Sequence, residues 1–312
     1  MPNNDVEQIQ RHTLVQISRI LLIDTYFQSS ASLVSSDISM LFLTAAILLI
    51  PLYSGVKATD AVGAVLLPLY IYPNPSIHPH PWTPLYNALG NHTQLGFDII
   101  INPDSGPTHK NLSDPELSDY LTALQHLKTF PNARVLGYVH AGFGDTSLQN
   151  DLLANISRYA AWANNNPPIH LDGIFIDESP ITYSTPSVNV YMNLAIATSH
   201  ARSSYLDTII LNPRQPADSR YFDIADSVVW FDGPYSQFNL GVFTALDERT
   251  RANCSALIRT FPAVEMTQSR LIPNLVSAHM GSLGITTADD YHSLSALWEP
   301  FVRYLDLYIN DD

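Results

Sequence analysis

Two adjacent carboxyl groups, Asp177 and Glu178, are the residues of this sequence with the clearest chemical potential. They follow a short apolar run at 173–176, and Ser179 and Pro180 end the segment. Acidic side chains are rarely buried without a partner or a role. A buried strand that ends in paired acids can present one of them as a general acid and the other as a base or nucleophile. The alternative is structural: the two acids cap the next helix or form salt bridges at the surface.

Short apolar runs recur along the chain after residue 60 and indicate strands. Each is rich in Val, Ile, Leu and aromatic residues, and most end in Pro, Gly, Asn or Asp. Because these runs are continuous rather than alternating, they are typical of parallel strands that are covered on both faces. They lie at 64–73, 97–103, 134–140, 172–178, 207–213, 226–232, 254–261 and 282–290.

Amphipathic segments between the runs predict helices. Apolar residues recur at helical spacing in 116–128, 148–163 and 291–308, and Pro300 kinks the last segment or marks a second start within it. The segments after the fifth and sixth runs give no clear helical pattern. Eight strands that alternate with helices over about 250 residues predict a (β/α)8 barrel of the TIM type.

A doubly wound open sheet is the alternative fold. It usually carries a glycine-rich first turn that cradles a phosphate. Here the first run ends in Tyr70, Ile71, Tyr72 and Pro73, which include no glycine. The barrel is therefore the prediction, and its catalytic residues should lie where the strands end at the carboxyl side.

Polar and aromatic side chains occupy these strand ends. Tyrosines pack against sugar faces, while Asn, His and Asp side chains hydrogen-bond hydroxyl or amino groups. Asn-Pro at 102–103 and at 212–213 is also a plain turn signal, and His140 can equally be a structural histidine. The predicted ring consists of Tyr70, Tyr72, Asn102, His140, Asp177, Glu178, Asn212, Asp232, Thr260 and Asp289.

Three carboxylates in this ring, Asp177, Glu178 and Asp232, favour glycoside hydrolysis. That reaction needs two carboxyl groups, one ionised and one held protonated. The sequence has no HExxH, no His/Cys cluster and no G-x-S-x-G, so we expect neither a metal, nor a cofactor, nor a serine nucleophile. Cys254 opens the seventh run and is predicted to pack in the core.

The composition narrows the class of partner. The chain has 312 residues, is 46% hydrophobic and carries a formal net charge of −14. An acidic chain has no basic surface with which to release counterions from nucleic acid, so no nucleic-acid partner is expected. An acidic surface attracts cations, which mildly favours a cationic or neutral substrate. The single cysteine permits no internal disulfide, and we expect a monomer.

The amino-terminal region predicts export. Residues 38–53 form an apolar run of 16 residues without charge, and Val56-Lys57-Ala58 resembles a small-residue cleavage site. From Met40 the run looks like a signal peptide; from Met1 it looks like a signal anchor of type II topology, with Arg11 and Arg19 on the cytoplasmic side. A buried helix is the third possibility. We therefore divide the chain into an extension, 1–58, and a barrel, 59–312, that is secreted or displayed at the cell surface.

Several motifs resemble the spherulin-4-like proteins, which are also classed as glycoside hydrolase family 135. The resemblance covers about residues 64–305 and rests on LPLYIYP, FDIIINPDSGP, VLGYVHAGFG, LDGIFIDESP, ADSVVWFDGPY and TADDYHSLSALWEPFV. It implies a (β/α)8 barrel with endo-acting α-1,4-galactosaminidase activity on galactosaminogalactan, a partly cationic fungal exopolysaccharide. It also implies export.

The resemblance places the catalytic carboxylates. It puts the family's Asp-Glu pair on Asp177 and Glu178, and a third carboxylate on Asp232. We assign Asp177 as nucleophile or transition-state stabiliser and Asp232 as the acid/base, with Glu178 as the alternative acid. The family pattern has Glu where this chain has Asp232, one methylene shorter, and His in the region of Arg259 and Thr260. These departures motivate a second hypothesis, a barrel of the cell wall or spore surface that binds polysaccharide with little or no cleavage. A third is an anchored developmental protein with a vestigial barrel.

Overall fold

The computed structural model describes residues 63–109, 114–164 and 168–310. The predicted export segment, 38–53, lies outside these residues. Within the described ranges, every helix is too short or too polar to cross a membrane.

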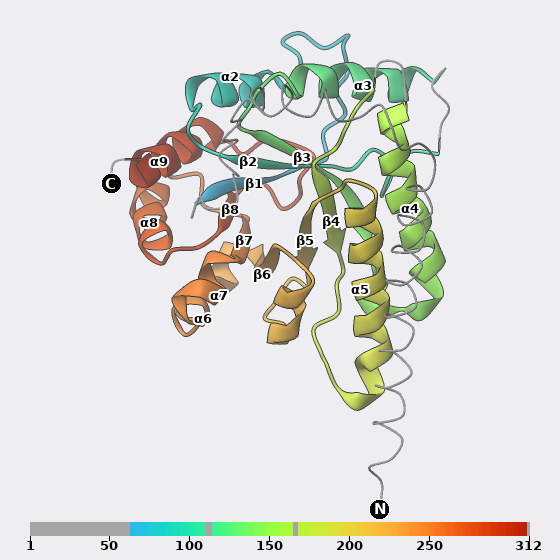
Figure 1. The fold of residues 1–312 in the computed structure, drawn as a ribbon. Coiled ribbons are helices and arrows are strands. Elements are labelled where there is room, and N and C mark those ends of the chain that lie inside the picture. The colour runs from blue at the N-terminus through green and yellow to red at the C-terminus, as the bar shows by residue number, and fades with distance from the viewer. Residues whose placement is uncertain (1–62, 110–113, 165–167, 311–312) are drawn as a thin grey trace, which may run out of the picture. The chain divides into compact units, whose positions relative to one another are not determined.

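Eight parallel strands close into a barrel in sequence order, as Figure 1 shows, and this confirms the predicted fold class. Each predicted apolar run overlaps one strand, and the third and sixth strands extend beyond their runs by one and two residues. In the longest runs the strand ends before the run does, because the chain leaves the barrel as a loop. The strands are β1 (Ala64–Leu69), β2 (Phe97–Ile101), β3 (Ala133–His140), β4 (Gly173–Asp177), β5 (Thr208–Asn212), β6 (Ser227–Pro234), β7 (Cys254–Arg259) and β8 (Ser282–Ile285).

Helices cover the outside of the barrel (Figure 1). They are α2 (Thr83–Asn91), α3 (Pro115–Leu127), α4 (Gln149–Ala161), α5 (Val188–Ser203), α6 (Gly241–Thr244), α7 (Glu248–Ala252), α8 (Glu265–Ser277) and α9 (Trp298–Asn310). The connection after β5 contains only a 3₁₀ turn, Ser219–Asp223, which agrees with the weak helical pattern there. The final helix begins at Trp298, seven residues later than the apolar pattern predicts, so Pro300 lies in its first turn, where proline is tolerated.

The interior of the barrel is built in three layers. The middle layer is apolar and takes one residue from each of seven strands, Leu66, Ile100, Leu136, Phe175, Ile210, Val229 and Leu257. On the eighth strand Gly284 stands at this level, because a Cβ there would lie 2.6 Å from Leu257 Cδ2 and 2.4 Å from the Leu66 carbonyl oxygen. This layer separates a polar floor from a polar rim.

The floor lies at the amino-terminal ends of the strands. Arg134 donates two hydrogen bonds to Asp98, at 2.6 and 2.8 Å, and Asp98 is almost fully buried. Beside this ion pair, the hydroxyls of Ser227, Ser255 and Ser282 form a chain with two contacts of 2.6 Å. Because these charged and hydroxyl side chains are paired with one another, the barrel tolerates them inside it.

A β-bulge in β6 sets the direction of Asp232. Val229 pairs with Ser255 on β7, but the next pairing is Phe231 with Ala256, so one extra residue is inserted between them. Side chains alternate between the two faces of a strand, and without the bulge Val229 and Asp232 would face opposite sides. With it, Asp232 pairs with Leu257 and points inward, as Val229 does.

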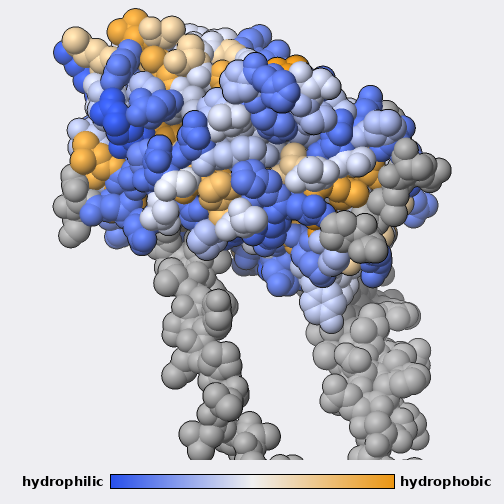
Figure 2. All heavy atoms as spheres, turned by 90° about the horizontal axis from the view of Figure 1, so that it is seen from above, coloured by the Kyte–Doolittle hydropathy of each residue, from blue (hydrophilic) through white to orange (hydrophobic). Residues whose placement is uncertain are grey.

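A second, larger apolar core fills the space between the strands and the helices. In the face seen in Figure 2, hydrophilic side chains dominate and hydrophobic ones occur in small scattered groups. Burial on both faces of the strands explains why the apolar runs in the sequence are continuous.

Candidate active site

Asp177 ends β4 and is the most heavily hydrogen-bonded side chain of the rim. Its carboxylate accepts bonds from Tyr138 Oη at 3.0 Å, Asn212 Nδ2 at 2.9 Å, Arg214 Nη2 at 3.1 Å and the Glu178 backbone N–H at 2.8 Å. The side chain is nearly buried. These donors come from three consecutive strands and the loops that follow them, so closure of the barrel fixes the orientation of this carboxylate.

Asp232 is the second buried carboxylate, and the bulge in β6 turns it toward Asp177. Its Oδ1 accepts from Tyr291 Oη at 2.9 Å and from Arg259 Nε at 3.2 Å, and its Oδ2 accepts from Asn212 Nδ2 at 2.9 Å. Asp232 therefore acts as an acceptor in all three contacts, one of which is an ion pair.

One amide nitrogen, Asn212 Nδ2, bridges the two carboxylates. It donates to Asp177 Oδ1 and to Asp232 Oδ2, each at 2.9 Å. The two hydrogens of an amide NH₂ diverge by about 120°, which places the two oxygens about 5 Å apart. A separation of about 5–5.5 Å is typical of retaining glycosidases, and about 6.5–9.5 Å is typical of inverting ones.

Glu178 has a different environment from the other two acids. Its side chain is 31% exposed, and its nearest ion-pair contacts are long, at 3.7 Å to Arg214 Nη2 and 3.9 Å to His140 Nδ1. Its backbone has a φ of 53°, a left-handed conformation that is uncommon outside glycine. The carboxyl of Glu178 is thus freer than those of Asp177 and Asp232 to exchange a proton with a ligand.

Three tyrosines form the wall between these acids. The ring of Tyr70 meets those of Tyr138 and Tyr291 edge-on, with centroids 5.6 Å apart in both pairs. Burial, reinforced by the charge of Asp177, raises the pKa of Tyr70 and Tyr138, and burial with the charge of Asp232 does the same for Tyr291. All three hydroxyls therefore keep their protons at neutral pH, and those of Tyr138 and Tyr291 donate to Asp177 and Asp232.

Two arginines flank the pair of aspartates. Arg259 contacts Asp232 and also donates from Nη1 to the carbonyl and the carboxylate of Asp289, at 2.8 and 3.0 Å. Burial alone would lower the pKa of Arg214, but its hydrogen bond with Asp177 and the surrounding acids outweigh burial and raise it. Both guanidinium groups are thus fixed charges that can offset the negative charge of the carboxylates.

Several strained backbone conformations lie at the carboxyl-terminal end of the barrel strands, where the acids lie. Phe143, Glu178, Arg214 and Thr260 follow four different strands, and all have φ between 49° and 64°. Such conformations cost about 1–3 kcal/mol each and are enriched at functional sites. Within the described part of the chain, no cluster of three or more His, Cys, Asp or Glu side chains is arranged to hold a metal ion. The arrangement is suited to proton transfer and nucleophilic attack by carboxylates.

The sequence profile of spherulation-specific family 4 matches residues 64–305, which is most of the chain. The chain belongs to spherulation-specific family 4. Among solved structures, Sph3 of Aspergillus clavatus in complex with GalNAc is 26% identical, covers 80% of this chain and 99% of its own, and superposes with a TM-score of 0.67. The GH5-4 endoglucanase of Clostridium longisporum shares the fold at 9% identity, covering 82% and 98% of the two chains, with a TM-score of 0.50. No curated relative matches the sequence.

This spherulin-4-like chain thus has a glycoside-hydrolase-like TIM barrel. Its predicted site residues Asp177, Asn212 and Asp232 meet directly, with Tyr70, His140, Glu178 and Asp289 around them. Thr260, also in the predicted ring, adopts a φ of 49° after β7.

Two residues of the predicted ring make other contacts. The Tyr72 hydroxyl donates to Asp119 on α3, and its ring packs edge-on against Tyr120. Asn102 Oδ1 accepts from the backbone N–H of Gly106 at 2.8 Å, which is the turn role that Asn-Pro also allows. The described contacts link neither side chain to Asp177, Glu178 or Asp232.

Four side chains of the rim were not predicted. Tyr138 lies two residues before His140 on β3, so period-two alternation could have found it. Arg214 follows Asn212-Pro213, and Tyr291 follows Asp289-Asp290; both lie in loops, where apolar patterns carry no information. Phe143 lies in the glycine-flanked turn after β3.

Proposed function

We propose that this protein is an exported, endo-acting glycoside hydrolase that cleaves α-1,4-linked, galactosamine-containing exopolysaccharide of the galactosaminogalactan type. The observation that carries the proposal is the pair of buried carboxylates joined by Asn212, at a separation suited to double displacement. The bound GalNAc of the related Sph3 supports an amino-sugar substrate.

In the proposed reaction, Asp177 attacks the anomeric carbon or stabilises the positive charge that develops there. Its four donors hold the carboxylate in one orientation, which limits the reorganisation needed in the transition state. A protonated carboxyl gives its proton to the glycosidic oxygen as the C–O bond breaks. It then takes a proton from the water that releases the sugar.

We assign the acid/base role to Asp232, with Glu178 as the alternative. The separation of about 5 Å from Asp177 supports Asp232. The lack of close hydrogen bonds to Glu178 among the described contacts supports the alternative, because a free carboxyl transfers its proton without first breaking an ion pair. Variants Asp232→Asn and Glu178→Gln decide between them: the acid is the one whose loss abolishes cleavage and is rescued by a substrate with a good leaving group.

The test of the function is incubation of the full-length protein with partly deacetylated galactosaminogalactan, assayed for new reducing ends. Cleavage by the wild type and its loss in Asp177→Asn are expected. Asp207→Asn is the matched control, because Asp207 is an exposed carboxyl directly before β5, at the opposite end of the barrel. Undiminished cleavage by Asp177→Asn and Glu178→Gln would refute the assignment.

A second candidate function is polysaccharide binding without cleavage. It is favoured by Arg259, which forms an ion pair with Asp232 at 3.2 Å and a second ion pair with Asp289. If the contact with Asp232 persists with substrate bound, three of the four lone pairs of Asp232 are occupied, and only one, on Oδ2, is left for the substrate. Binding of the polymer without new reducing ends, together with activity gained by Asp232→Glu, would support this candidate over the hydrolase.

Export and a monomeric state complete the proposal. The apolar run 38–53 and the small residues after it support an amino-terminal signal peptide or anchor. Sequencing the amino terminus of the protein recovered from its host separates the two, because a mature chain that begins near Thr59 excludes an anchor. Light scattering of the purified protein tests the monomer.

A further inference from the structure

The turn after β3 holds a phenylalanine in a backbone conformation that favours glycine. Gly142, Phe143 and Gly144 have φ of 55°, 54° and 93°. The two glycines adopt these angles at little cost, whereas a residue with a bulky side chain is strained there. A glycine at position 143 would remove the strain, so the presence of a large ring calls for a role of the side chain.

The ring of Phe143 is also unusually exposed. Its exposed fraction is 56%, and only Met266 and Tyr205 exceed this among the exposed large hydrophobic residues described. Packing in the protein interior therefore does not account for the ring. One face is partly occupied: the guanidinium carbon of Arg214 lies 5.6 Å from the ring centroid, within the range of a cation–π contact.

Three contacts fix the turn beside the reacting groups. The backbone N–H of Phe143 donates to the Glu178 carbonyl at 2.6 Å, and that of Ala141 donates to the Asp177 carbonyl at 2.9 Å. Arg214, which lies over the ring, also donates to Asp177 Oδ2 at 3.1 Å. The exposed ring is thus held next to the carboxylates, with a hydrogen-bond donor between the ring and Asp177.

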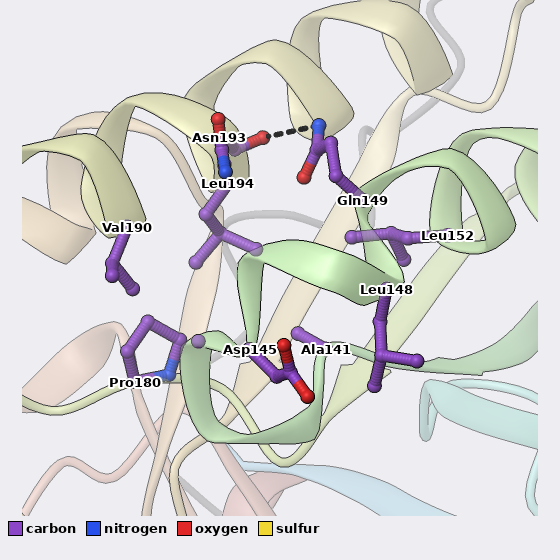
Figure 3. A pocket seen from close by; sticks show the side chains of 10 residues that line it. Ala141, Asp145, Leu148, Gln149, Leu152, Pro180, Val190, Asn193 and Leu194 are labelled. Carbon is purple, nitrogen blue, oxygen red and sulfur yellow. Dashed lines mark hydrogen bonds between the residues drawn. The ribbon is translucent and has the colours of Figure 1, made fainter.

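The turn is supported from behind by packed helices, and Figure 3 shows this region. A Cβ at Gly142 would lie 2.5 Å from Leu148, and one at Gly144 would lie 2.3 Å from Val190, so the backbone rests directly on these side chains. Gln149 Nε2 donates to the Asn193 carbonyl at 3.0 Å and joins α4 to α5 behind the turn. A ring mounted on such a base is preorganised for a ligand.

The chemistry of this surface fits a sugar. A galacto-configured pyranose carries its C3–H, C4–H and C5–H bonds on one face, because the 4-hydroxyl is axial, and that apolar face stacks on an aromatic ring. Guanidinium N–H groups at the edge can bind a hydroxyl or an acetamido oxygen. A flat, rigid aromatic side chain contributes contact area at low cost in conformational entropy.

We propose that Phe143 and Arg214 form a sugar-binding subsite adjacent to the point of cleavage, in which the ring stacks on one residue of the amino-sugar polymer. This inference rests on the proposed function for the identity of the polymer. The subsite positions the chain across Asp177 and Asp232, and the ring of Phe143 takes no part in bond breaking.

The test removes the ring without adding strain. The Phe143→Gly variant of the full-length protein is expected to fold with unchanged or higher thermal stability. Its KM for a long α-1,4-linked N-acetylgalactosamine oligosaccharide should rise roughly tenfold, which corresponds to a typical stacking contribution. Its kcat should stay within about twofold of the wild-type value. Phe143→Tyr is expected to restore KM. Tyr205→Gly is the matched control: Tyr205 is an exposed aromatic with φ of 63°, at the far end of α5.

Binding measured by calorimetry in an Asp177→Asn background separates this inference from the proposed function. Binding that weakens roughly tenfold on Phe143→Gly supports the subsite, even if the wild type releases no reducing ends. Equal oligosaccharide affinity with and without the ring overturns the subsite, even if the wild type cleaves the polymer. So does an equal loss of affinity in Tyr205→Gly, because the effect would then be a general one.

Discussion

Replacing Asn212 by Asp is the sharpest test of the bridge between the two carboxylates. The two side chains have the same shape, and the substituted carboxyl can still accept the hydrogen bond of 3.0 Å from the Arg214 backbone N–H. The change is at the amide nitrogen of residue 212, because the NH₂ group that donates to Asp177 and Asp232 is replaced by an oxygen that accepts. Two charge-assisted hydrogen bonds of 2.9 Å are lost together.

The expected effect is large. Three carboxylates at such distances would repel one another by about 6 kcal/mol per contact at an effective dielectric constant of 20, so the substituted carboxyl takes up a proton instead. A single proton restores at most one of the two donated bonds. Loss of one preorganised donor from a site of developing charge costs about 10²–10³ in kcat, and we expect a fall of that size at neutral pH.

The proton on the new carboxyl of Asn212→Asp determines how the stability and activity of this variant change with pH. The carboxyl is protonated in the folded variant at pH values where it is ionised in the unfolded chain, so the folded state binds more protons above about pH 4. The variant should therefore lose stability relative to the wild type as the pH rises. Its residual activity should fall in the same direction, because ionisation removes the last donor.

The assays are reducing-end release against pH and thermal unfolding of the same samples. Asn102→Asp is the matched control, since Asn102 also precedes proline at a strand end. Its one described side-chain hydrogen bond is accepted from Gly106 N–H at 2.8 Å, and Asp preserves it. We expect that control to change activity less than threefold. Similar activity of the wild type and Asn212→Asp, or equal losses in the two Asn→Asp variants, would refute the bridging role.

Three further predictions concern the rim, the floor and the core. Tyr291→Phe removes a hydrogen bond of 2.9 Å from Asp232; kcat should fall about tenfold with a stability loss of about 1 kcal/mol, and an unchanged kcat would contradict the assigned contact. Arg134→Met leaves Asp98 buried without its partner; denaturant unfolding should show a loss of about 3–5 kcal/mol, and a loss below about 1 kcal/mol would show that the pair is dispensable. Burial raises the pKa of the Cys254 thiol from 9.0 to about 12, so thiol reagents should not label the folded protein at pH 8 and should label it after unfolding; rapid labelling of the folded protein would contradict this.

The fold was predictable because its strands are buried on both faces. Continuous apolar runs mark such strands clearly, and all eight coincide with strands of the barrel. The last helix was less predictable. Its apolar spacing extends back to Leu294, but Ser295 Oγ instead accepts hydrogen bonds from the Thr287 and Leu297 backbone N–H groups and holds that stretch as a loop. Local periodicity cannot show such a competing contact.

The candidate site was predictable where chemistry coincides with a strand end. Asp177, Asn212 and Asp232 lie within or at the ends of strands and have polar side chains, which is why a reading of strand ends finds them. Arg214 and Tyr291 reach the same carboxylates from loops, and only closure of the barrel brings them there. Asn102 and Tyr72 show the opposite case, because suitable residue types at a strand end can serve the local structure instead.

The bulge in β6 accommodates one extra residue between Val229 and Asp232 while both side chains stay on the inner face of the barrel. Deletion of Trp230 or Phe231 would restore regular alternation, and Asp232 would then follow Val229 by two residues and still face inward opposite Leu257. An inserted residue that formed no bulge would instead turn every later side chain of the strand to the other face. This segment can thus differ in length by one residue without loss of the carboxylate from the site, provided that the bulge is gained or lost with that residue.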